Sequence, residues 1–333
     1  MAATVLGLDI GGANLKAAHS SGTACLRPFA LWKSSEQLTD ALSQLLRDMP
    51  PHDLLALTMT GELCDCFESK RQGVHAILDA VEAAAAAVPI RVWRTDECFV
   101  NLEMAKAEPL LVAAANWQAL ATFCGRFAPS GSALVVDIGS TTSDIIPLHN
   151  GKPVPRGRTD PERLKSRELA YTGVRRTPVC AILGARGAAE VFATTHDVYL
   201  LLGDIKEDAG DCETADGRPA TKAAAQARLA RMLCADGETC SAADLHQLAK
   251  QIHARQVRVI RQAVNKVSRS LREAPRRIVL TGSGEFLAQR ALDFPPALTS
   301  TRISLTRTLG STVSAAACAY ALAILAVERG HDA

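Results

Sequence analysis

Leu8-Asp9-Ile10-Gly11-Gly12-Ala13-Asn14-Leu15-Lys16-Ala17-Ala18 recurs in altered form as Val136-Asp137-Ile138-Gly139-Ser140-Thr141-Thr142-Ser143-Asp144-Ile145-Ile146. Each stretch predicts a strand with an aspartate near its end, a turn that begins with glycine, and a second strand. The two copies are too far apart to be neighbouring units of a short repeat, so we place one copy in each of two domains. The sequence therefore predicts an internal duplication built on two β-hairpins.

The composition is that of a folded protein with two cores of ordinary size. The chain has 333 residues, of which 48% are apolar and 22% charged, and this length is more than one core comfortably serves. Its 37 basic and 35 acidic residues nearly balance, and no run of Lys or Arg indicates a nucleic-acid partner. The Ala-rich segment 312–327 is short for a membrane span and predicts a buried helix. We expect a cytoplasmic protein that binds neither nucleic acid nor membrane.

The first part of the chain alternates strands and helices, which is typical of an α/β domain. Strands are expected at 54–60 and 90–94, and helices at 73–88 and 108–127. Pro129-Ser130-Gly131-Ser132 then interrupts the pattern. We place the domain boundary there, with a first lobe over residues 1–130 and a second lobe over 131–333.

The second part carries more helix. An irregular connection is expected at 150–165, and helices dominate from 223 to about 272. We therefore predict a helical insertion over about 155–275. The long polar segment 204–222 is either a lid over the site or an ordinary surface loop.

The C-terminal part returns to the strand and helix pattern of the core. A strand at 278–281, a glycine turn and a helix at 285–292 are expected in that order. The last helix is predicted over 311–329, with Ser311 or Thr312 as its N-cap. We expect this helix to pack back on the first lobe.

The turn of the first hairpin has the residues of a phosphate site. Gly11 and Gly12 let backbone N–H groups approach an anion closely. Asn14 adds a hydrogen-bond donor, and Lys16 adds a positive charge. Asp9 would hold Mg²⁺ partly through water, because this ion prefers oxygen ligands and keeps part of its hydration shell. We therefore predict catalytic roles for Asp9 and Lys16.

The second turn repeats this arrangement with hydroxyl donors. Gly139-Ser140-Thr141-Thr142 would bind phosphate, and Asp137 would be a second magnesium ligand. Asp144 projects from the same strand face as Thr142 and is either a catalytic general base or a further metal carboxylate. Gly282-Ser283-Gly284, between a strand and a helix, is a third predicted phosphate contact. Three such motifs in one chain favour a phosphate site over three unrelated turns.

These three motifs resemble those of the superfamily of sugar kinases, actins and heat-shock chaperones. The two phosphate hairpins of that superfamily match the segments at Asp9 and Asp137, and Gly282-Ser283-Gly284 looks like its adenosine motif. The resemblance implies a two-lobed, actin-like (ribonuclease H-like) α/β fold with duplicated hairpins and a helical insertion. It also implies that a small phosphorylated substrate and Mg²⁺ lie between the lobes, where ATP or another nucleotide could bind.

Within that superfamily the chain resembles the short hydantoinase A and oxoprolinase-related proteins linked to tetrahydromethanopterin-dependent one-carbon transfer. The resemblance rests on the segments 8–16, 58–63, 114–117, 136–144, 171–178 and 214–221. It implies a transferase of methanofuran biosynthesis. Such an enzyme joins an aminomethylfuran-methyl diphosphate to the phenol of tyramine, glutamyl-tyramine or a tyrosine-like acceptor and releases diphosphate.

Five polar residues are candidate substrate contacts, and each could equally be a helix cap, a surface residue or a structural hydrogen-bond partner. They are Glu62, Asp96, Asn101, Asn116 and Arg175.

Two other functions stay open at this stage. One is an ATP-dependent kinase of a small metabolite, with Asp144 as the base and Gly282-Ser283-Gly284 near adenine. The other is a non-enzymatic, nucleotide-operated activator or binding module, in which closure of the lobes changes a partner surface. Assembly into a homo-oligomer is compatible with all three functions.

Overall fold

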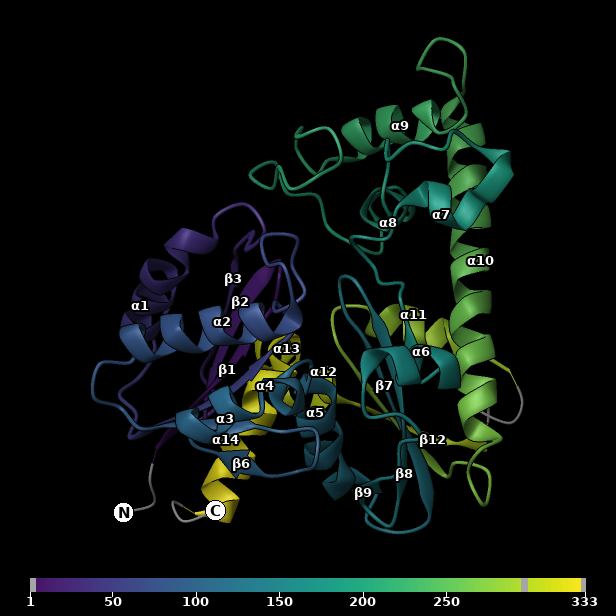
Figure 1. Cartoon of the computed structure of the whole chain (residues 1–333). Helices are drawn as coiled ribbons and strands as arrows, with labels where there is room; N and C mark the ends of the chain where they lie inside the picture. The colour runs from purple at the N-terminus through teal and green to yellow at the C-terminus, as the bar shows by residue number, and fades with distance from the viewer. Residues whose placement is uncertain (1–3, 295–298, 331–333) are drawn as a thin grey trace.

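Two lobes stand side by side in the computed structural model, which describes residues 4–294 and 299–330 (Figure 1). The outer ends of the two predicted lobes, residues 1–3 and 331–333, lie outside the described residues. Each lobe is built around a β-sheet, and a group of helices extends the second lobe upward in the view of Figure 1.

The sheet of the first lobe has six strands. They are β1 (Val5–Ile10), β2 (Asn14–His19), β3 (Ala24–Pro28), β4 (Leu54–Met59), β5 (Ile90–Trp93) and β6 (Phe99–Val100). Their order across the sheet is β3-β2-β1-β4-β5-β6. β1 to β3 form an antiparallel meander, while β4 and β5 run parallel to β1. β1 and β4 are buried at every position because both are apolar runs in the middle of the sheet.

Helices connect the strands of this sheet or follow its last strand, and they pack against it. They are η1 (Ser35–Gln37), α1 (Leu38–Asp48), α2 (Lys70–Ala84), α3 (Leu102–Ala107) and α4 (Pro109–Val112). α1 buries Leu38, Leu42 and Leu45, which recur at helical spacing and so form one apolar face. Ser69 starts α2 by accepting a hydrogen bond from Gln72 N. α1 and α2 lie together on one side of the sheet (Figure 1).

The sheet of the second lobe repeats the order of β3-β2-β1-β4-β5. Its strands are β7 (Ser132–Ile138), β8 (Ser143–His149), β9 (Lys152–Pro153), β10 (Leu169–Ala170), β11 (Arg277–Thr281) and β12 (Thr301–Ser304). Their order is β10-β8-β7-β11-β12, with β9 beside β8. As in the first sheet, three strands form an antiparallel meander and two more run parallel to the first of them. The predicted duplication is confirmed, and the chain has the two-lobed, actin-like α/β fold.

Helices inserted between β10 and β11 take the place that α1 occupies in the first lobe. They are α7 (Val179–Leu183), η3 (Gly184–Arg186), α8 (Thr195–Leu202), α9 (Lys222–Arg231) and α10 (Ala242–Ser268). α10 runs from the second sheet to the far end of the insertion, where α7, α8 and α9 surround it (Figure 1). This part has a core of its own. Arg228 and Asp197 form a buried ion pair inside it, with Arg228 Nε 2.7 Å from Asp197 Oδ1.

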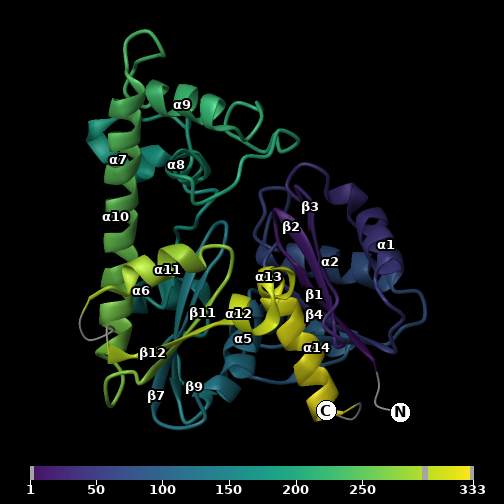
Figure 2. The same cartoon turned by 180° about the vertical axis from the view of Figure 1, so that it is seen from behind.

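Two helices lie between the sheets and tie the lobes together. α5 (Asn116–Cys124) follows the first sheet but packs with the second, and η2 (Gly125–Phe127) continues it. α14 (Ala317–Arg329) follows the second sheet but packs against β1, β4 and α5. Figure 2 shows α14 lying along β1 and β4. No helix in the described ranges, α14 included, is long and apolar enough to cross a membrane.

Three local predictions are wrong in detail. The single helix expected at 108–127 is broken into α4 and α5, because Ala114 adopts a φ of 49° that no helix accepts. The connection at 150–165 contains β9 and the start of α6 (Asp160–Ser166), which a capping box at Thr159 begins. The last helix begins after Gly310, not at a Ser311 or Thr312 cap, and is split into α13 (Ser311–Ala315) and α14.

The remaining helices complete the second lobe around its sheet. α11 (Glu285–Ala291) lies between β11 and β12 in the chain and corresponds to the helix predicted at 285–292. α12 (Leu305–Leu309) leads from β12 toward α13. In the parallel pair of β11 and β12, α11 is therefore the crossover helix.

Gly7 offers a test of how closely α14 approaches the first sheet. A Cβ at Gly7 would lie 1.8 Å from the carbonyl oxygen of Ala319 in α14, so the backbones must separate to admit it. We expect Gly7→Ala to lower the free energy of unfolding by about 3 kcal/mol, as overpacking a close contact does. Gly237→Ala is the control, because no atom lies within 4 Å of a Cβ there. Equal denaturation midpoints for the two variants would contradict the close packing.

Candidate active site

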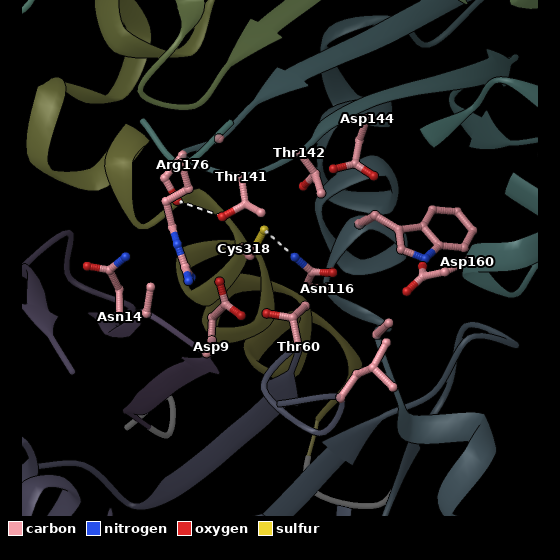
Figure 3. Close-up of a pocket in the computed structure, with 18 of the residues that line it drawn as sticks. Asp9, Asn14, Thr60, Asn116, Thr141, Thr142, Asp144, Asp160, Arg176 and Cys318 are labelled. Carbon is pink, nitrogen blue, oxygen red and sulfur yellow. Dashed lines mark hydrogen bonds between the residues drawn. The ribbon is translucent and has the colours of Figure 1, made fainter. Parts of the chain in front are cut away.

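A cavity of about 340 Å³ lies between the lobes, a volume in the range of small-molecule sites. Both hairpin turns, 11–14 and 139–142, line it from opposite sides (Figure 3). The other lining residues are Asp9, Lys16, Trp32, Thr60, Glu62, Leu63, Cys64, Asp65, Ala114, Asn116, Trp117, Asp137, Asp144, Asp160, Arg163, Leu169, Tyr171, Arg176 and Cys318. The structure therefore brings the two predicted phosphate turns and their aspartates together.

Asp9 and Lys16 face each other across the first hairpin. They are paired in register between β1 and β2, and Asp9 Oδ2 lies 3.4 Å from Lys16 Nζ. Burial opposes the charge of Lys16, but the Asp9 carboxylate outweighs it with help from Asp137, so the pKa of Lys16 is above its ordinary value. Lys16 is therefore an ammonium at neutral pH, and it can pair with a bound phosphate.

The carboxylates at the turns fit a magnesium ion held together with phosphate. Asp9 Oδ1 is buried and has no hydrogen-bond partner among the described residues, which is costly unless another group completes it. Asp137 lines the same cavity. Within the described part of the chain, no three His, Cys, Asp or Glu side chains are grouped to hold a metal by themselves. Mg²⁺ usually binds through one or two carboxylates together with substrate phosphates, so these residues suit it.

The second turn is held from behind by the segment that follows β10. The backbone N–H groups of Arg175 and Arg176 donate to the carbonyl oxygen of Ser140, at 3.0 and 2.9 Å. Gly173 lies so close that a Cβ there would be 2.5 Å from the backbone of Ser140. A turn fixed in this way can present its hydroxyl groups to an anion without rearranging.

Asp137 and Asp144 face each other across the second hairpin, in the register that pairs Asp9 with Lys16 in the first. Burial raises the pKa of Asp137 to about 7, with Asp144 adding to the rise and Lys16 opposing it. Burial also raises the pKa of Asp144, although the guanidinium of Arg163 opposes the shift. Two acids of raised pKa therefore stand side by side in the cavity wall.

Arg163 fixes the position of the Asp144 carboxylate. One guanidinium nitrogen of Arg163 donates to Asp144 Oδ1 at 2.7 Å, and Arg163 is only 1% exposed. The same guanidinium lies 4.0 Å from the ring centroid of Trp117, a cation–π contact between α6 and α5. Asp144 is thus a buried, oriented carboxylate rather than a freely solvated one.

Glu62 lies in the cavity wall just after β4. The residue is 1% exposed, its Oε1 lies 4.0 Å from Lys70 Nζ, and its Oε2 has no hydrogen-bond partner among the described residues. Burial raises the pKa of Glu62 to about 7 against the smaller opposing effects of its own backbone N–H and of Lys70. The structure therefore places Glu62, one of the predicted substrate contacts, in the cavity wall as a weakly paired acid.

This raised pKa predicts a pH-dependent stability difference between wild type and Glu62→Gln. The folded pKa of about 7 exceeds the ordinary 4.5, so the folded state holds this proton more tightly than the unfolded state. The cost of ionising Glu62 is absent below pH 4.5 and complete above about pH 7, where it is on the order of 3 kcal/mol. We expect equal denaturation midpoints at pH 4.5 and a higher midpoint for Glu62→Gln at about pH 8. The same midpoint difference at both pH values would contradict this assignment.

Three predicted substrate contacts do not line the cavity. Asp96 binds Arg94 through both carboxylate oxygens, at 3.0 and 2.8 Å. Asn101 is the N-cap of α3 and accepts a hydrogen bond from its backbone. Arg175 reaches Asp211 in the 204–222 loop, with 2.6 Å between guanidinium nitrogen and carboxylate oxygen. Asn116, by contrast, does reach the cavity (Figure 3).

The third predicted phosphate turn is also absent from the cavity lining. A Cβ at Gly282, whose φ is 86°, would lie 2.3 Å from the carbonyl oxygen of Ile138 and 2.4 Å from Asp137 Oδ1. The backbone N–H of Gly284 donates to the same carbonyl at 2.8 Å. These glycines let the turn before α11 pack against the end of β7, behind Asp137.

Several cavity residues escaped the sequence analysis. Arg176 points into the cavity where Arg175 does not, and its guanidinium lies 4.4 Å from the ring centroid of Trp32. Cys318 reaches the site from α14, with its Sγ 3.8 Å from Asn116 Nδ2. Thr60 follows the apolar strand β4, and such a strand end is a signal that could have been used. Neither Arg176 nor Cys318 has an equivalent local signal.

The family model described as hydantoinase/oxoprolinase matches residues 53–327. The chain belongs to this family. The matched residues run from the start of β4 to α14, so they include the second β-hairpin and both helices between the sheets. The first hairpin, with Asp9 and Lys16, precedes them.

This hydantoinase/oxoprolinase family chain is similar over nearly its whole length to a protein of Methanocaldococcus jannaschii. That relative is named (4-{4-[2-(gamma-L-glutamylamino)ethyl]phenoxymethyl}furan-2-yl)methanamine synthase, and it is 36% identical over 96% of this chain and 97% of its own. A protein of the same name from Methanococcus vannielii is 34% identical over 58% of this chain and 90% of its own.

Among solved structures, the nucleotide-free structure of an acetone carboxylase shares the fold. Its TM-score is 0.57 at 10% sequence identity, and the match covers 97% of this chain and 70% of that one. Because the identity is low, the similarity concerns the fold alone.

Proposed function

We propose that the chain is a transferase of methanofuran-type cofactor biosynthesis. It would join an aminomethylfuran-methyl diphosphate to the phenol oxygen of tyramine, glutamyl-tyramine or a tyrosine-like acceptor and release diphosphate. The observation that carries the proposal is the 36% identity, over 96% of the chain, to a relative named as the synthase of a phenoxymethyl-furan methanamine. The cavity supports it, because the two predicted phosphate turns and Lys16 line one space between the lobes.

The reaction exchanges one carbon–oxygen bond for another. The phenol oxygen forms a bond to the methylene carbon of the furan, the bond from that carbon to the diphosphate oxygen breaks, and diphosphate leaves with the electron pair. The furan ring stabilises positive charge that develops on the methylene carbon. The phenol proton goes to a base in the protein, so charge must be compensated at the leaving group and at the attacking oxygen.

Residues of both turns would bind the diphosphate. Lys16 and Arg176 supply positive charge, while Asn14 and the Ser140 and Thr141 hydroxyl groups supply hydrogen-bond donors. Asp9 and Asp137 would hold Mg²⁺, which would supply further compensation for the charge of the leaving diphosphate. Apart from Arg176, whose backbone is hydrogen-bonded to Ser140, these side chains stand on the two β-hairpins, so they need little reorganisation during the reaction.

Asp144 is the proposed acceptor of the phenol proton. Its carboxylate lines the cavity, and burial raises its pKa, which makes it a stronger base than an exposed aspartate. Arg163 orients it through the 2.7 Å hydrogen bond. The base would then lie on β8, the strand that follows the second turn.

Product analysis tests this proposal. Purified protein is mixed with Mg²⁺, the aminomethylfuran-methyl diphosphate, and tyramine or glutamyl-tyramine, and the products are identified by mass spectrometry. We expect an ether product and an equal amount of diphosphate. Absence of both, in a sample that binds the diphosphate substrate, would contradict the proposal. Consumption of ATP with phosphorylation of an acceptor would assign the chain to the kinases instead.

A further inference from the structure

One wall of the cavity carries two carboxylates whose ion pairs within the protein are long. Glu62 belongs to the first lobe and Asp160 to the second, and both approach the same ammonium group, that of Lys70. The distances are 4.0 Å from Glu62 Oε1 and 3.8 Å from Asp160 Oδ2, too long for hydrogen bonds. Asp65 lines the same cavity. Asp160 Oδ1 also lies 3.9 Å from Arg163 Nη1, in a guanidinium whose other nitrogen is hydrogen-bonded to Asp144. Glu62 and Asp160 therefore share one loosely placed ammonium, that of Lys70.

Of Glu62 and Asp160, Glu62 has fewer partners. Its side chain is 1% exposed and lines the cavity, yet its Oε2 has no hydrogen-bond partner among the described residues. A buried carboxylate oxygen without a hydrogen-bond donor costs free energy, and a bound ligand with a positively charged N–H group would remove that cost. The pKa of Glu62, raised to about 7 by burial, agrees with a missing cation.

This carboxylate lies next to the first phosphate turn. The backbone N–H groups of Thr60 and Gly61 both donate to the carbonyl oxygen of Ile10, at 2.9 and 3.0 Å. A Cβ at Gly61 would lie 3.3 Å from the backbone of Gly11. Because Glu62 is the next residue, a ligand group bound by it is only a short molecule away from a phosphate bound at the turn.

We propose that Glu62, with Asp160, binds the primary ammonium group of the furan diphosphate substrate. This inference rests on the proposed function and names the substrate group that the wall of the cavity recognises. In that substrate only the furan ring and two methylene groups separate the ammonium nitrogen from the diphosphate oxygen. The ligand would then span the site from the phosphate turns to Glu62, with an ion pair at each end.

The donor substrate fits this wall better than the acceptor does. The acceptor phenol attacks from the side of the methylene carbon opposite the leaving diphosphate, so its own ammonium points away from the turn beside Glu62. In glutamyl-tyramine that ammonium is also accompanied by a carboxylate, which Glu62, Asp65 and Asp160 would repel.

Binding of two small probes tests the ammonium site without any turnover. Furfurylamine and furfuryl alcohol differ in the charged group, and their dissociation constants are measured by NMR titration with Mg²⁺ and pyrophosphate present. We expect wild type to bind furfurylamine about tenfold or more tighter than furfuryl alcohol, because a buried ion pair forms with the amine alone. Glu62→Gln should bind both equally. No preference in wild type, or an unchanged preference in Glu62→Gln, would overturn the proposal.

Two further variants make this comparison secure. Glu68→Gln removes the same charge from an exposed position on the same loop and should keep the wild-type preference. Asp160→Asn, from the opposite lobe, should reduce the preference severalfold, and it carries the test if Glu62→Gln does not fold. The proposal would be refuted if Asp160→Asn kept the full preference for furfurylamine while Glu68→Gln lost it. The preference would then come from the overall charge of this region and not from a binding site.

Turnover separates this inference from the proposed function. The ratio of kcat/KM for the aminomethyl diphosphate to that for its methyl analogue should exceed ten in wild type and approach one in Glu62→Gln. Transfer with the same ratio in both proteins would refute the ammonium site and leave the transferase standing. No transfer, with the furfurylamine preference intact, would refute the transferase and leave the ammonium site standing.

Discussion

Asp9→Asn is expected to lower kcat/KM for the transfer by about 10³-fold or more. The substitution keeps the size of the side chain but removes the charge that would hold Mg²⁺ and that pairs with Lys16 at 3.4 Å. Asp9 Oδ1, the buried oxygen without a partner among the described residues, becomes part of a neutral amide. The rate is measured as ether formation at several Mg²⁺ concentrations, so that weaker metal binding is distinguished from a slower chemical step.

The matched control for this variant is Asp40→Asn, an exposed aspartate on α1 of the same lobe. It should have wild-type activity. Asp9→Asn should also remain folded, because the amide keeps the size of the side chain, the register of β1 and β2 is unchanged, and the Lys16 side chain that loses its partner is 29% exposed. An Asp9→Asn protein with activity within tenfold of wild type at the same Mg²⁺ concentration would refute the assigned role.

The two β-hairpins at Asp9 and Asp137 are predictable from sequence because their signal is local. An aspartate near the end of an apolar strand, a glycine turn and a second strand occupy about a dozen residues, and the structure keeps all of them in one hairpin. At Gly282-Ser283-Gly284 the same kind of local signal has a structural explanation. A glycine that must approach Ile138 and Asp137 looks the same in sequence as one that must approach a phosphate.

Residues that reach the cavity over long sequence distances leave no such signal. Arg163 meets Asp144 through packing of α6 on the second sheet, and Cys318 arrives on α14, which crosses to the first sheet. Arg175 and Arg176 are chemically equivalent neighbours, and the tertiary structure alone determines which one enters the cavity. Asn101 is a different case, because an asparagine just before a helical segment is a recognisable N-cap.

Arg163→Met is expected to have the largest effect on stability among substitutions near the site. It should lower the free energy of unfolding by roughly 3 to 5 kcal/mol. Arg163 is 1% exposed, and its removal leaves the Asp144 carboxylate buried without its 2.7 Å partner, close to Asp137. The contact with the Trp117 ring is lost as well. The free energy of unfolding is measured by denaturant titration, and Arg158→Met, an exposed arginine just before the same helix, should change it by less than about 0.5 kcal/mol.

The pH dependence of this loss identifies its cause. Burial already raises the pKa of Asp144, and without Arg163 that pKa rises further, so the variant folds with Asp144 protonated at higher pH than wild type does. The deficit should therefore be small at acidic pH and grow as the pH rises through the folded pKa of the variant. Adding Asp144→Asn to Arg163→Met should recover most of the lost stability, because no unpaired charge remains. A deficit independent of pH, with no recovery in the double variant, would mean that Arg163 stabilises the lobe through its contact with Trp117 instead of through the ion pair.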